Sequence, residues 1–254
     1  MGKVEVLMSV MMQNDLAVAE RTNIRSDVLI INQCDTNKRW NDVLKYCVIR
    51  CINTTNRGLS NSRNMAIQNA KGDFCLLCDD DEILDDDYVE KISSEFEKNP
   101  KADIICFIIE RNGKKYPTKP FKVGFYRSLQ ISSVQMVMRR NSIIKSKVKF
   151  DENFGSGSPN GSGEENIFMF DCLKKKLKIY YVPVHIGKLL PSESTWFKGF
   201  DKDYFLKRGR IFRRLFGAYG YIHSIYFALS KYKRYRNSVS FFGAVKLMYE
   251  GMRG

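Results

Sequence analysis

Residues 57–82 read RGLSNSRNMAIQNAKGDFCLLCDDDE. The first part of this stretch predicts a helix over Ser60–Ala70, and the pair Lys71-Gly72 then breaks it. The apolar run Phe74–Leu77 predicts a short strand that is buried on both faces. A helix that leads through a glycine turn into a buried strand is a unit of α/β proteins, so this stretch favours an α/β fold.

The same alternation continues on both sides of this stretch. Strands are predicted before it at Val4–Val10, Val28–Ile31 and Val48–Ile52. After it come an amphipathic helix, Asp86–Lys98, and a β-branched strand, Ile104–Ile109. Strands and helices that alternate with short connections predict a mostly parallel sheet covered by helices, with ligands bound at the carboxyl ends of the strands.

The second half of the chain is less regular. Residues 111–126 contain Gly and Pro, and a strand is predicted after them at Val134–Met138. A glycine- and serine-rich loop, residues 155–163, then leads into a helix that begins at Glu164 and runs to about Lys176.

Four consecutive carboxylates, Asp79 to Glu82, directly follow the strand-like run Phe74–Cys78. Acids that crowd at the end of a buried strand repel one another and are costly without a counter-charge. A surface loop could solvate them, but a hard cation that prefers oxygen, Mg²⁺ or Mn²⁺, would explain them better. We therefore expect a divalent-metal site here, which would bridge two phosphates and stabilise a departing diphosphate.

Residues 57–81 closely resemble the signature of family 2 glycosyltransferases. In that family a Gly-Leu-Ser/Ala helix with an Arg-Asn pair leads through Lys-Gly-Asp/Glu into a hydrophobic strand and an Asp-x-Asp motif. The resemblance is looser over the rest of the first half and leaves the C-terminal quarter mostly unmatched. It implies a GT-A fold, in which a Rossmann-like, mostly parallel sheet is flanked by helices. It also implies a UDP-sugar donor, a divalent metal (Mn²⁺ or Mg²⁺) and inversion at the anomeric carbon.

Carried over by position, the resemblance implies roles for the acids and for one arginine. Asp79 or Asp80 would lie near the ribose and the donor sugar, and Asp81, with Asp79, would bind the metal. Arg63 would lie near the nucleotide, where its guanidinium can pair with phosphate or brace the acid that binds the base.

Two loops depart from the family pattern. Residues from Ser9 to Asn14 replace the usual Pro-x-Tyr-Asn-like loop after the first strand, and Ser9 and Met11 become the donor-binding candidates there. The second strand ends in Ile-Asn-Gln-Cys-Asp instead of Asp-Asp-Gly-Ser. The family's acid that accepts a hydrogen bond from uracil is therefore replaced by Asn32 or by Asp35, and uracil is favoured without being fixed.

Glu164 and Glu165 resemble the Glu-Asp pair with which the family opens a helix after a mobile loop. Inverting transfer needs a carboxylate to take the proton from the acceptor hydroxyl. By position Glu165 replaces the usual Asp as this base, and Glu164 is the alternative; both could instead only cap the helix. The loop of residues 155–163 would let the base close over the substrates.

Two further residues have open roles. His185, in the run Tyr180–Ile186, is a candidate third metal ligand because some GT-A enzymes place a histidine there, or it is structural. Trp196 is a candidate platform for stacking on the acceptor sugar, or it is a core residue.

The positive charge is concentrated at the C-terminus. The net charge is +14, and from Lys198 onward thirteen basic residues and three acidic ones contribute +10. We expect a catalytic domain over residues 1–197, divided at about residue 110 into a nucleotide-sugar half and an acceptor half. A basic, aromatic helical extension over residues 198–254 would follow and dock on an anionic membrane surface or on the acceptor.

The chain shows no signal peptide and no stretch of roughly 18–20 apolar residues, so we expect a cytoplasmic protein that associates peripherally with the inner face of the membrane. Its seven cysteines are scattered through apolar runs. We expect them to be buried, reduced thiols.

The function that these features predict is the transfer of a hexose or N-acetylhexosamine from a UDP-sugar to a hydroxyl of a glycan. The acceptor would be lipid-linked and the pathway that of a surface polysaccharide. No P-loop and no Gly-x-Ser-x-Gly elbow is present. A nucleotidyltransferase is the nearest enzymatic alternative, because it too holds metal and nucleotide on strand-end acids. A non-catalytic nucleic-acid-binding protein is the other, although we expect nucleic acid not to be the partner.

Overall fold

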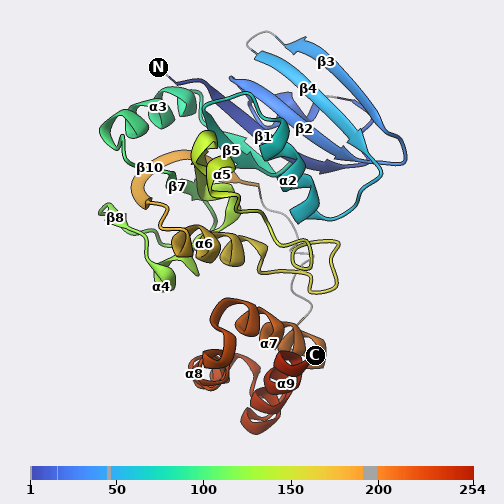
Figure 1. Ribbon diagram of the computed structural model, residues 1–254, viewed down its shortest axis with the longest axis vertical. Helices are drawn as coiled ribbons and strands as arrows, with labels where there is room; N and C mark the ends of the chain where they lie inside the picture. The colour runs from blue at the N-terminus through green and yellow to red at the C-terminus, as the bar shows by residue number, and fades with distance from the viewer. Residues whose placement is uncertain (1, 16, 45–46, 191–198) are drawn as a thin grey trace.

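The computed structural model describes residues 2–15, 17–44, 47–190 and 199–254. Within them a single mixed sheet is formed by β1 (Val4–Met11), β2 (Asp27–Gln33), β3 (Lys38–Leu44), β4 (Cys47–Thr54), β5 (Phe74–Cys78), β6 (Glu82–Leu84), β7 (Ile104–Glu110), β8 (Phe121–Lys122), β9 (Met136–Arg139) and β10 (Ile179–Leu189). The strand order is β3-β4-β2-β1-β5-β9-β7-β10-β6, with β8 paired to β10 (Figure 1). The strands β4, β2, β1 and β5 are parallel neighbours, as are β7 and β10. The predicted α/β fold with a mostly parallel sheet is confirmed.

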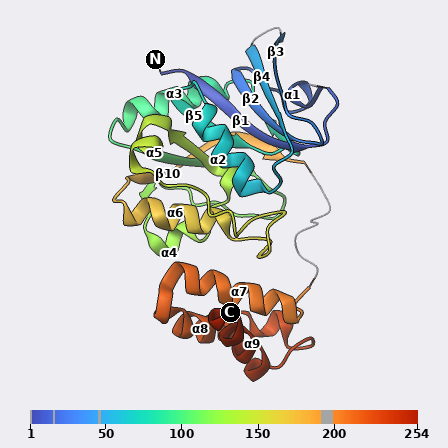
Figure 2. The ribbon, with the colours of Figure 1, turned by 45° about the vertical axis from the view of Figure 1, so that its right-hand side comes forward.

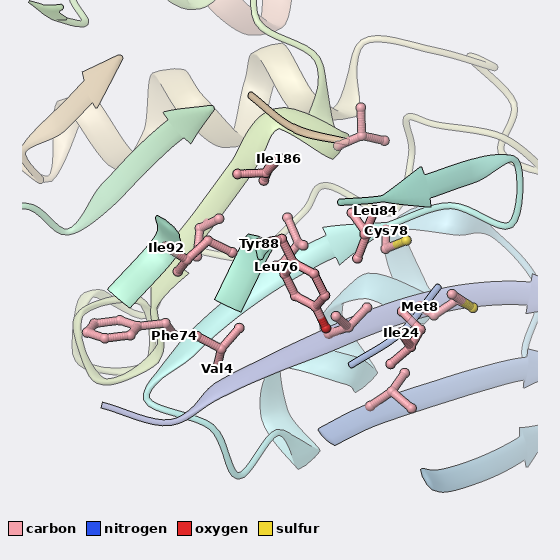
Figure 3. Close-up of a cluster of buried hydrophobic side chains, with 14 of the residues drawn as sticks. Val4, Met8, Ile24, Phe74, Leu76, Cys78, Leu84, Tyr88, Ile92 and Ile186 are labelled. Atoms are coloured by element: carbon pink, nitrogen blue, oxygen red, sulfur yellow. The ribbon is translucent and has the colours of Figure 1, made fainter. Parts of the chain in front are cut away.

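Helices cover both faces of this sheet: α1 (Ala17–Arg21), α2 (Leu59–Asn69), α3 (Tyr88–Lys98), α4 (Phe125–Ser128), α5 (Arg140–Ser146) and α6 (Glu164–Lys174). Successive side chains of a strand point to opposite faces, so β1 sends Val6 and Met8 into one core and Leu7 into the other. The first core lies against α1 and α3, and Figure 3 shows Tyr88 and Ile92 of α3 in it. The second core lies against α2, α5 and α6.

The six predicted strands are present, one of them shortened, and four of the described strands were not predicted: β3, β6, β8 and β10. The expected strand Val134–Met138 begins as a 3-10 turn, η1 (Ser133–Gln135), and only then continues as β9. A capping box between Ser132 and Gln135 stabilises that turn. The unpredicted strand β3 pairs antiparallel with β4 at the edge of the sheet.

The two expected halves of the catalytic domain share the sheet. The strand β9 belongs to the acceptor half, yet it runs antiparallel between β5 and β7 of the nucleotide-sugar half. Within the described residues 111–190, β9 therefore belongs to the middle of the sheet.

Three helices follow at the C-terminus: α7 (Lys202–Phe216), α8 (Gly220–Tyr235) and α9 (Phe241–Arg253), with a 3-10 turn, η2 (Gly217–Tyr219), before α8. Glycines let α7 and α9 cross closely. A Cβ on Gly209 would lie 2.0 Å from the carbonyl oxygen of Met248, and one on Gly251 would lie 2.1 Å from that of Leu206. No side chain fits at either position.

The C-terminal helices are docked on the catalytic domain (Figure 2). Ile211 and Leu215 of α7 share an apolar cluster with Phe154 and with Ile167 of α6. Arg214 of α7 forms ion pairs with two carboxylates of the catalytic domain, Asp151 at 2.7 Å and Asp171 at 2.6 Å. Residues 198–254 therefore include helices that are packed against the domain, instead of a detached tail.

The cysteines and the apolar segments can be compared with what the sequence predicts. All seven cysteines are buried and unpaired, and burial raises the pKa of the Cys75 and Cys78 thiols, which keeps them unreactive. Within the described ranges, no helix combines the length and the apolarity that a bilayer-spanning segment needs.

Candidate active site

Three carboxylates come together at the carboxyl end of β5. Asp79, Asp81 and Glu82 each offer an oxygen within 4.8 Å of the others. Asp79 and Asp81 are partly exposed, whereas Glu82 is 0% exposed. Asp80, between them in the sequence, is exposed. The motif therefore presents two accessible acids above one buried acid.

Glu82 is the member of this group to which the sequence assigned no role. Its Oε1 accepts a hydrogen bond from the backbone N–H of Asp79 at 2.7 Å, while its buried Oε2 has no hydrogen-bond partner among the described residues. Burial, with the charge of Asp79 adding to it, raises the pKa of Glu82 well above its usual range. An all-oxygen group with an unpartnered buried oxygen fits a divalent cation such as Mg²⁺ or Mn²⁺.

Arg63 links the two ends of the candidate site. Its side chain is 3% exposed, and its guanidinium lies 3.0 Å from Glu164 and 3.4 Å from Asp79. A third bond runs from its Nη2 to the hydroxyl of Ser133 at 2.8 Å. Burial opposes the charge on Arg63, but the neighbouring acids outweigh it and raise the pKa of Arg63 above its ordinary value. Arg63 is therefore a buried, charged residue that three side chains hold in place.

Other polar residues of α2 form hydrogen bonds with segments that are distant in the sequence. Ser62 donates a hydrogen bond to Ser9 at the end of β1, at 2.8 Å. Ser60 donates one to the carbonyl of Phe154 at 2.6 Å. Asn64 pairs with the backbone of Phe150 through both its amide nitrogen and its oxygen. The run Ser-Asn-Ser-Arg-Asn is thus the framework of the site.

Glu164 and Glu165 open α6 as expected, in two different environments. Glu164 is buried and held by Arg63, whereas Glu165 is half-buried. Burial first, and then the charge of Glu164, raise the pKa of Glu165 to about 7. A carboxylate with a pKa near neutrality is suited to accept a proton at physiological pH. Of the two acids, Glu165 is therefore the better candidate for the general base, while Glu164 is engaged by Arg63.

The glycine-rich loop before this pair is held against α2. Leu59 donates its backbone N–H to the carbonyl of Ser156 at 2.9 Å. Gly155, Gly157, Gly161 and Gly163 all have positive φ, a conformation that side chains disfavour. The loop also meets α7, because Arg210 donates to the side chain of Asn160 at 3.2 Å.

Gly163 joins this loop to the helix that carries the base, and we expect Gly163→Ala to lower the free energy of unfolding. A Cβ there would lie 2.9 Å from Ile211 of α7, at φ +92°. Strain of this backbone region costs roughly 1–2 kcal/mol, and overpacking adds about 1–3 kcal/mol. Urea denaturation of Gly163→Ala measures the sum. Gly113→Ala, at φ +74° with no atom within 4 Å, measures the strain alone. Equal losses in the two variants would contradict a contribution from Ile211.

The donor-binding candidates of β1 and β2 lie at the same carboxyl edge but differ in accessibility. Met11 is exposed and Ser9 is partly buried. Asn32 is buried, and its amide bonds both the N–H and the carbonyl of Gln13, which fixes the loop after β1. Asp35 is exposed and pairs with Arg57 at 2.5 Å.

Among the described residues, the group of carboxylates at the end of β5 does not include His185, whose role as a third metal ligand stays a prediction. Its Nδ1 lies 2.8 Å from Asp85, and its Nε2 lies 3.4 Å from Glu110. The pairing of β10 with β7 shifts register on both sides of His185. Trp196 lies outside the described residues.

A cleft of about 630 Å³ lies on the acceptor half. Among the described residues, its lining includes no acid but four cations and two tyrosines: Lys114, Lys115, Lys119, Arg127, Tyr116 and Tyr181. Gln135 connects the cleft to the site, because it accepts a hydrogen bond from Lys114 at 3.2 Å and belongs to the same turn as Ser133, which contacts Arg63. No sequence pattern marks this cleft, because most of its lining comes from the irregular stretch 114–121 and the rest from α4 through η1 and from β10.

The family model for Glycosyl transferase family 2 matches residues 6–157, more than half of the chain. The chain belongs to this family. The match begins in β1 and ends within the glycine-rich loop, so it includes Arg63 and the acids from Asp79 to Glu82 but not Glu165.

Two curated relatives of family 2 are similar over part of their length. An uncharacterized glycosyltransferase of Haemophilus influenzae is 28% identical over 114 residues, which are 42% of this chain and 38% of that protein. The uncharacterized glycosyltransferase YwdF of Bacillus subtilis is 36% identical over 109 residues, 40% of each. The chain thus matches about two fifths of the length of these relatives.

Solved structures show that the family 2 fold here is of GT-A type. The structure of S. aureus TarS 1–349 matches with a TM-score of 0.64 and 14% identity, covering 98% of this chain and 81% of that one. The same protein in complex with UDP-GlcNAc matches with a TM-score of 0.62 and 14% identity, covering 96% and 81%. Both likenesses extend over the C-terminal helices as well as the sheet.

Proposed function

We propose that the protein is an inverting glycosyltransferase. It moves a hexose or N-acetylhexosamine from a UDP-sugar to a hydroxyl of a glycan acceptor. The observation that carries the proposal is the bridge formed by Arg63, which joins the strand-end acid Asp79 to Glu164 beside the candidate base. Family membership and the UDP and UDP-GlcNAc complexes of the structural neighbour support a UDP-sugar donor.

The donor would bind at the carboxyl edge formed by β1, β2 and β5. Ser9 and Met11 border it on β1, and Asp79 and Asp80 face the ribose and the sugar. Asn32 would act on the nucleotide through the loop that it fixes, while the exposed Asp35 would meet the base directly. Asp81, Asp79 and Glu82 would hold Mn²⁺ or Mg²⁺, which supplies positive charge to the diphosphate when bound.

Glu165 would take the proton from the acceptor hydroxyl. The acceptor oxygen then forms a bond to the anomeric carbon while the bond from that carbon to UDP breaks on the opposite side, and UDP keeps the electron pair. Configuration is inverted because the two bonds lie on opposite faces. Glu164 is less suited to this step, since its Oε1 is engaged by Arg63.

The acceptor would enter from the cleft that contains Lys114 and Arg127. Its cations suit an acceptor with negatively charged groups, and its tyrosines suit contact with sugar rings. A lipid-linked glycan of a surface polysaccharide meets both requirements. We place the reaction at the inner face of the membrane, with the catalytic domain of residues 1–197 working beside the basic helices of residues 198–254.

The test is UDP release from a panel of UDP-sugars, with Mn²⁺, with Mg²⁺ or with EDTA. We expect slow release from one donor, which EDTA abolishes and added Mn²⁺ restores, and Asp81→Ala should lower the rate by about 10²-fold or more. Asp87→Ala is the matched control, because Asp87 is an exposed acid six positions later that pairs with Lys91. Release that is unaffected by EDTA would contradict the metal site. Absence of release from every donor, together with absence of UDP binding by calorimetry, would contradict the function.

A further inference from the structure

Helix α8 presents an apolar face to solvent. Ile222, Tyr226 and Leu229 are 64%, 71% and 62% exposed, and Ile225 and Tyr232 are also exposed. These positions follow the spacing i, i+3, i+4, i+7 and so lie on one side of the helix. We call these five residues the α8 strip. Side chains of this kind normally face a core, so an unpartnered row of them on a helix indicates a binding surface.

The opposite side of α8 is already packed against the protein. Ser224, Ala228 and Tyr235 are fully buried, and the rings of Phe227 and Phe212 of α7 lie 5.6 Å apart. The α8 strip therefore cannot turn inward without breaking the C-terminal cluster. Figures 1 and 2 place α8, together with α7 and α9, below the sheet and the helices that cover it.

The strip continues onto the catalytic domain through helix α4. Tyr126 of α4 is 72% exposed and stacks with His223 of α8 at 6.2 Å between ring centroids. Phe125 is exposed next to it and packs edge-on against Phe170 of α6. A surface that lies against α8 would therefore also contact α4. Arg127 of α4 lines the acceptor cleft.

The charge around the strip decides which partner fits it. No Asp or Glu occurs between Asp203 and Glu250, and Lys233, Arg234 and Arg236 are exposed at the end of α8. A second copy of this chain would bring like charges together across the same face. A nucleic acid would satisfy the cations but would offer no apolar medium to isoleucine and leucine. An anionic bilayer surface satisfies both, because phosphates lie at the level of the cations and acyl chains lie just below.

We propose that the α8 strip, extended by Phe125 and Tyr126, lies on an anionic bilayer surface. Its apolar side chains would enter the boundary between headgroups and acyl chains, and the cations at the end of α8 would contact lipid phosphates. The inference deepens the proposed function and rests on it, since it identifies the face through which the enzyme would approach a lipid-linked acceptor. The docked helix α7, which contacts the loop before Glu165 through Arg210, connects this face to the site.

The experiment uses the full chain and co-sedimentation with two kinds of vesicle, phosphatidylglycerol mixed with phosphatidylcholine and phosphatidylcholine alone. We expect binding to the anionic vesicles that weakens with salt, and about a tenfold or greater loss of that binding in Ile222→Ser/Leu229→Ser. The matched control is Val43→Ser/Val48→Ser. It removes two aliphatic side chains that are 74% and 42% exposed on β3 and β4, at the opposite end of the molecule, and it should bind like the wild type (Figure 1).

Three outcomes would overturn the inference. The first is equal vesicle binding by both double variants. The second is a dimer in size-exclusion chromatography that Ile222→Ser/Leu229→Ser converts to a monomer. The third is binding to single-stranded RNA that anionic vesicles fail to compete. UDP release, measured without vesicles on each variant, separates the membrane proposal from the enzyme proposal. A double variant of the α8 strip that releases UDP normally but no longer binds vesicles supports both proposals. Vesicle binding by the wild type without any UDP release contradicts the enzyme function alone.

Discussion

Replacing Glu165 with glutamine should slow sugar transfer by about 10³-fold while leaving UDP binding intact. Glutamine keeps the shape of the side chain but cannot accept the proton of the acceptor hydroxyl. The proposed donor contacts lie on other elements, so the dissociation constant of UDP, measured by calorimetry, should change little. Steady-state transfer to an acceptor measures the rate. The matched control is Glu97→Gln, which makes the same substitution at an exposed position of α3 and should behave as wild type.

The pH dependence distinguishes a base from a merely structural acid. The base acts in its deprotonated form, and burial together with Glu164 raises the pKa of Glu165 to about 7. The rate should therefore fall as the pH drops through about 7. Glu164→Gln removes a neighbouring negative charge, so it should lower the pKa of Glu165 and move this acid limb to lower pH. If the rate of Glu165→Gln still falls at low pH, another group titrates. The same conclusion follows if the pH of this fall is unchanged in Glu164→Gln.

Replacing Arg63 with alanine should destabilise the fold by about 3–5 kcal/mol, because it leaves Glu164 buried without its partner and removes the counter-charge of Asp79. For a chain of this length that loss corresponds to a fall in Tm on the order of 10 °C. Thermal and urea denaturation measure it. The variant should also move the acid limb to higher pH, since Arg63 lowers the pKa of Glu165.

Two further variants define what Arg63 supplies. Arg63→Lys keeps the charge but lacks the planar fork that contacts Glu164, Asp79 and Ser133 together, so it should recover only part of the stability. Arg213→Ala, on the exposed side of α7, should change the free energy of unfolding by less than about 0.5 kcal/mol. Wild-type stability in Arg63→Lys would mean that a single positive charge suffices.

The sequence was most informative where structure is local. The strand β5 and the acids after it could be predicted because a continuous apolar run and a charge cluster are visible in a short window. The partners of α2 could not. Ser60, Ser62 and Asn64 bond segments that are 94, 53 and 86 positions away, and no periodicity encodes such distances. The family signature located these residues without explaining them.

Other features of the fold and the candidate site could not be predicted for similar physical reasons. Glu82 reads as one more surface acid, and only the folded chain reveals that it is buried with an unpartnered oxygen. The strand β3 carries charged residues on an exposed edge, so it lacks the alternation that marks a half-buried strand. The place of His185 beside Asp85 and Glu110 could not be predicted, because the pairing of β10 with β7 is irregular there. The C-terminal charge suggested an appendage, whereas the docking of α7 depends on Arg214 meeting Asp151 and Asp171, 63 and 43 positions earlier.

The place of β9 in the sheet has a consequence for how the chain folds during synthesis. Until residues 136–139 have left the ribosome, β5 and β7 have no strand between them, and each presents an open row of backbone donors and acceptors. Residues 1–110 are therefore synthesised before β9, the strand that pairs with both β5 and β7, is available. A nascent chain that stalls after residue 110 should need chaperone protection, because its two apolar strand edges are templates for aggregation.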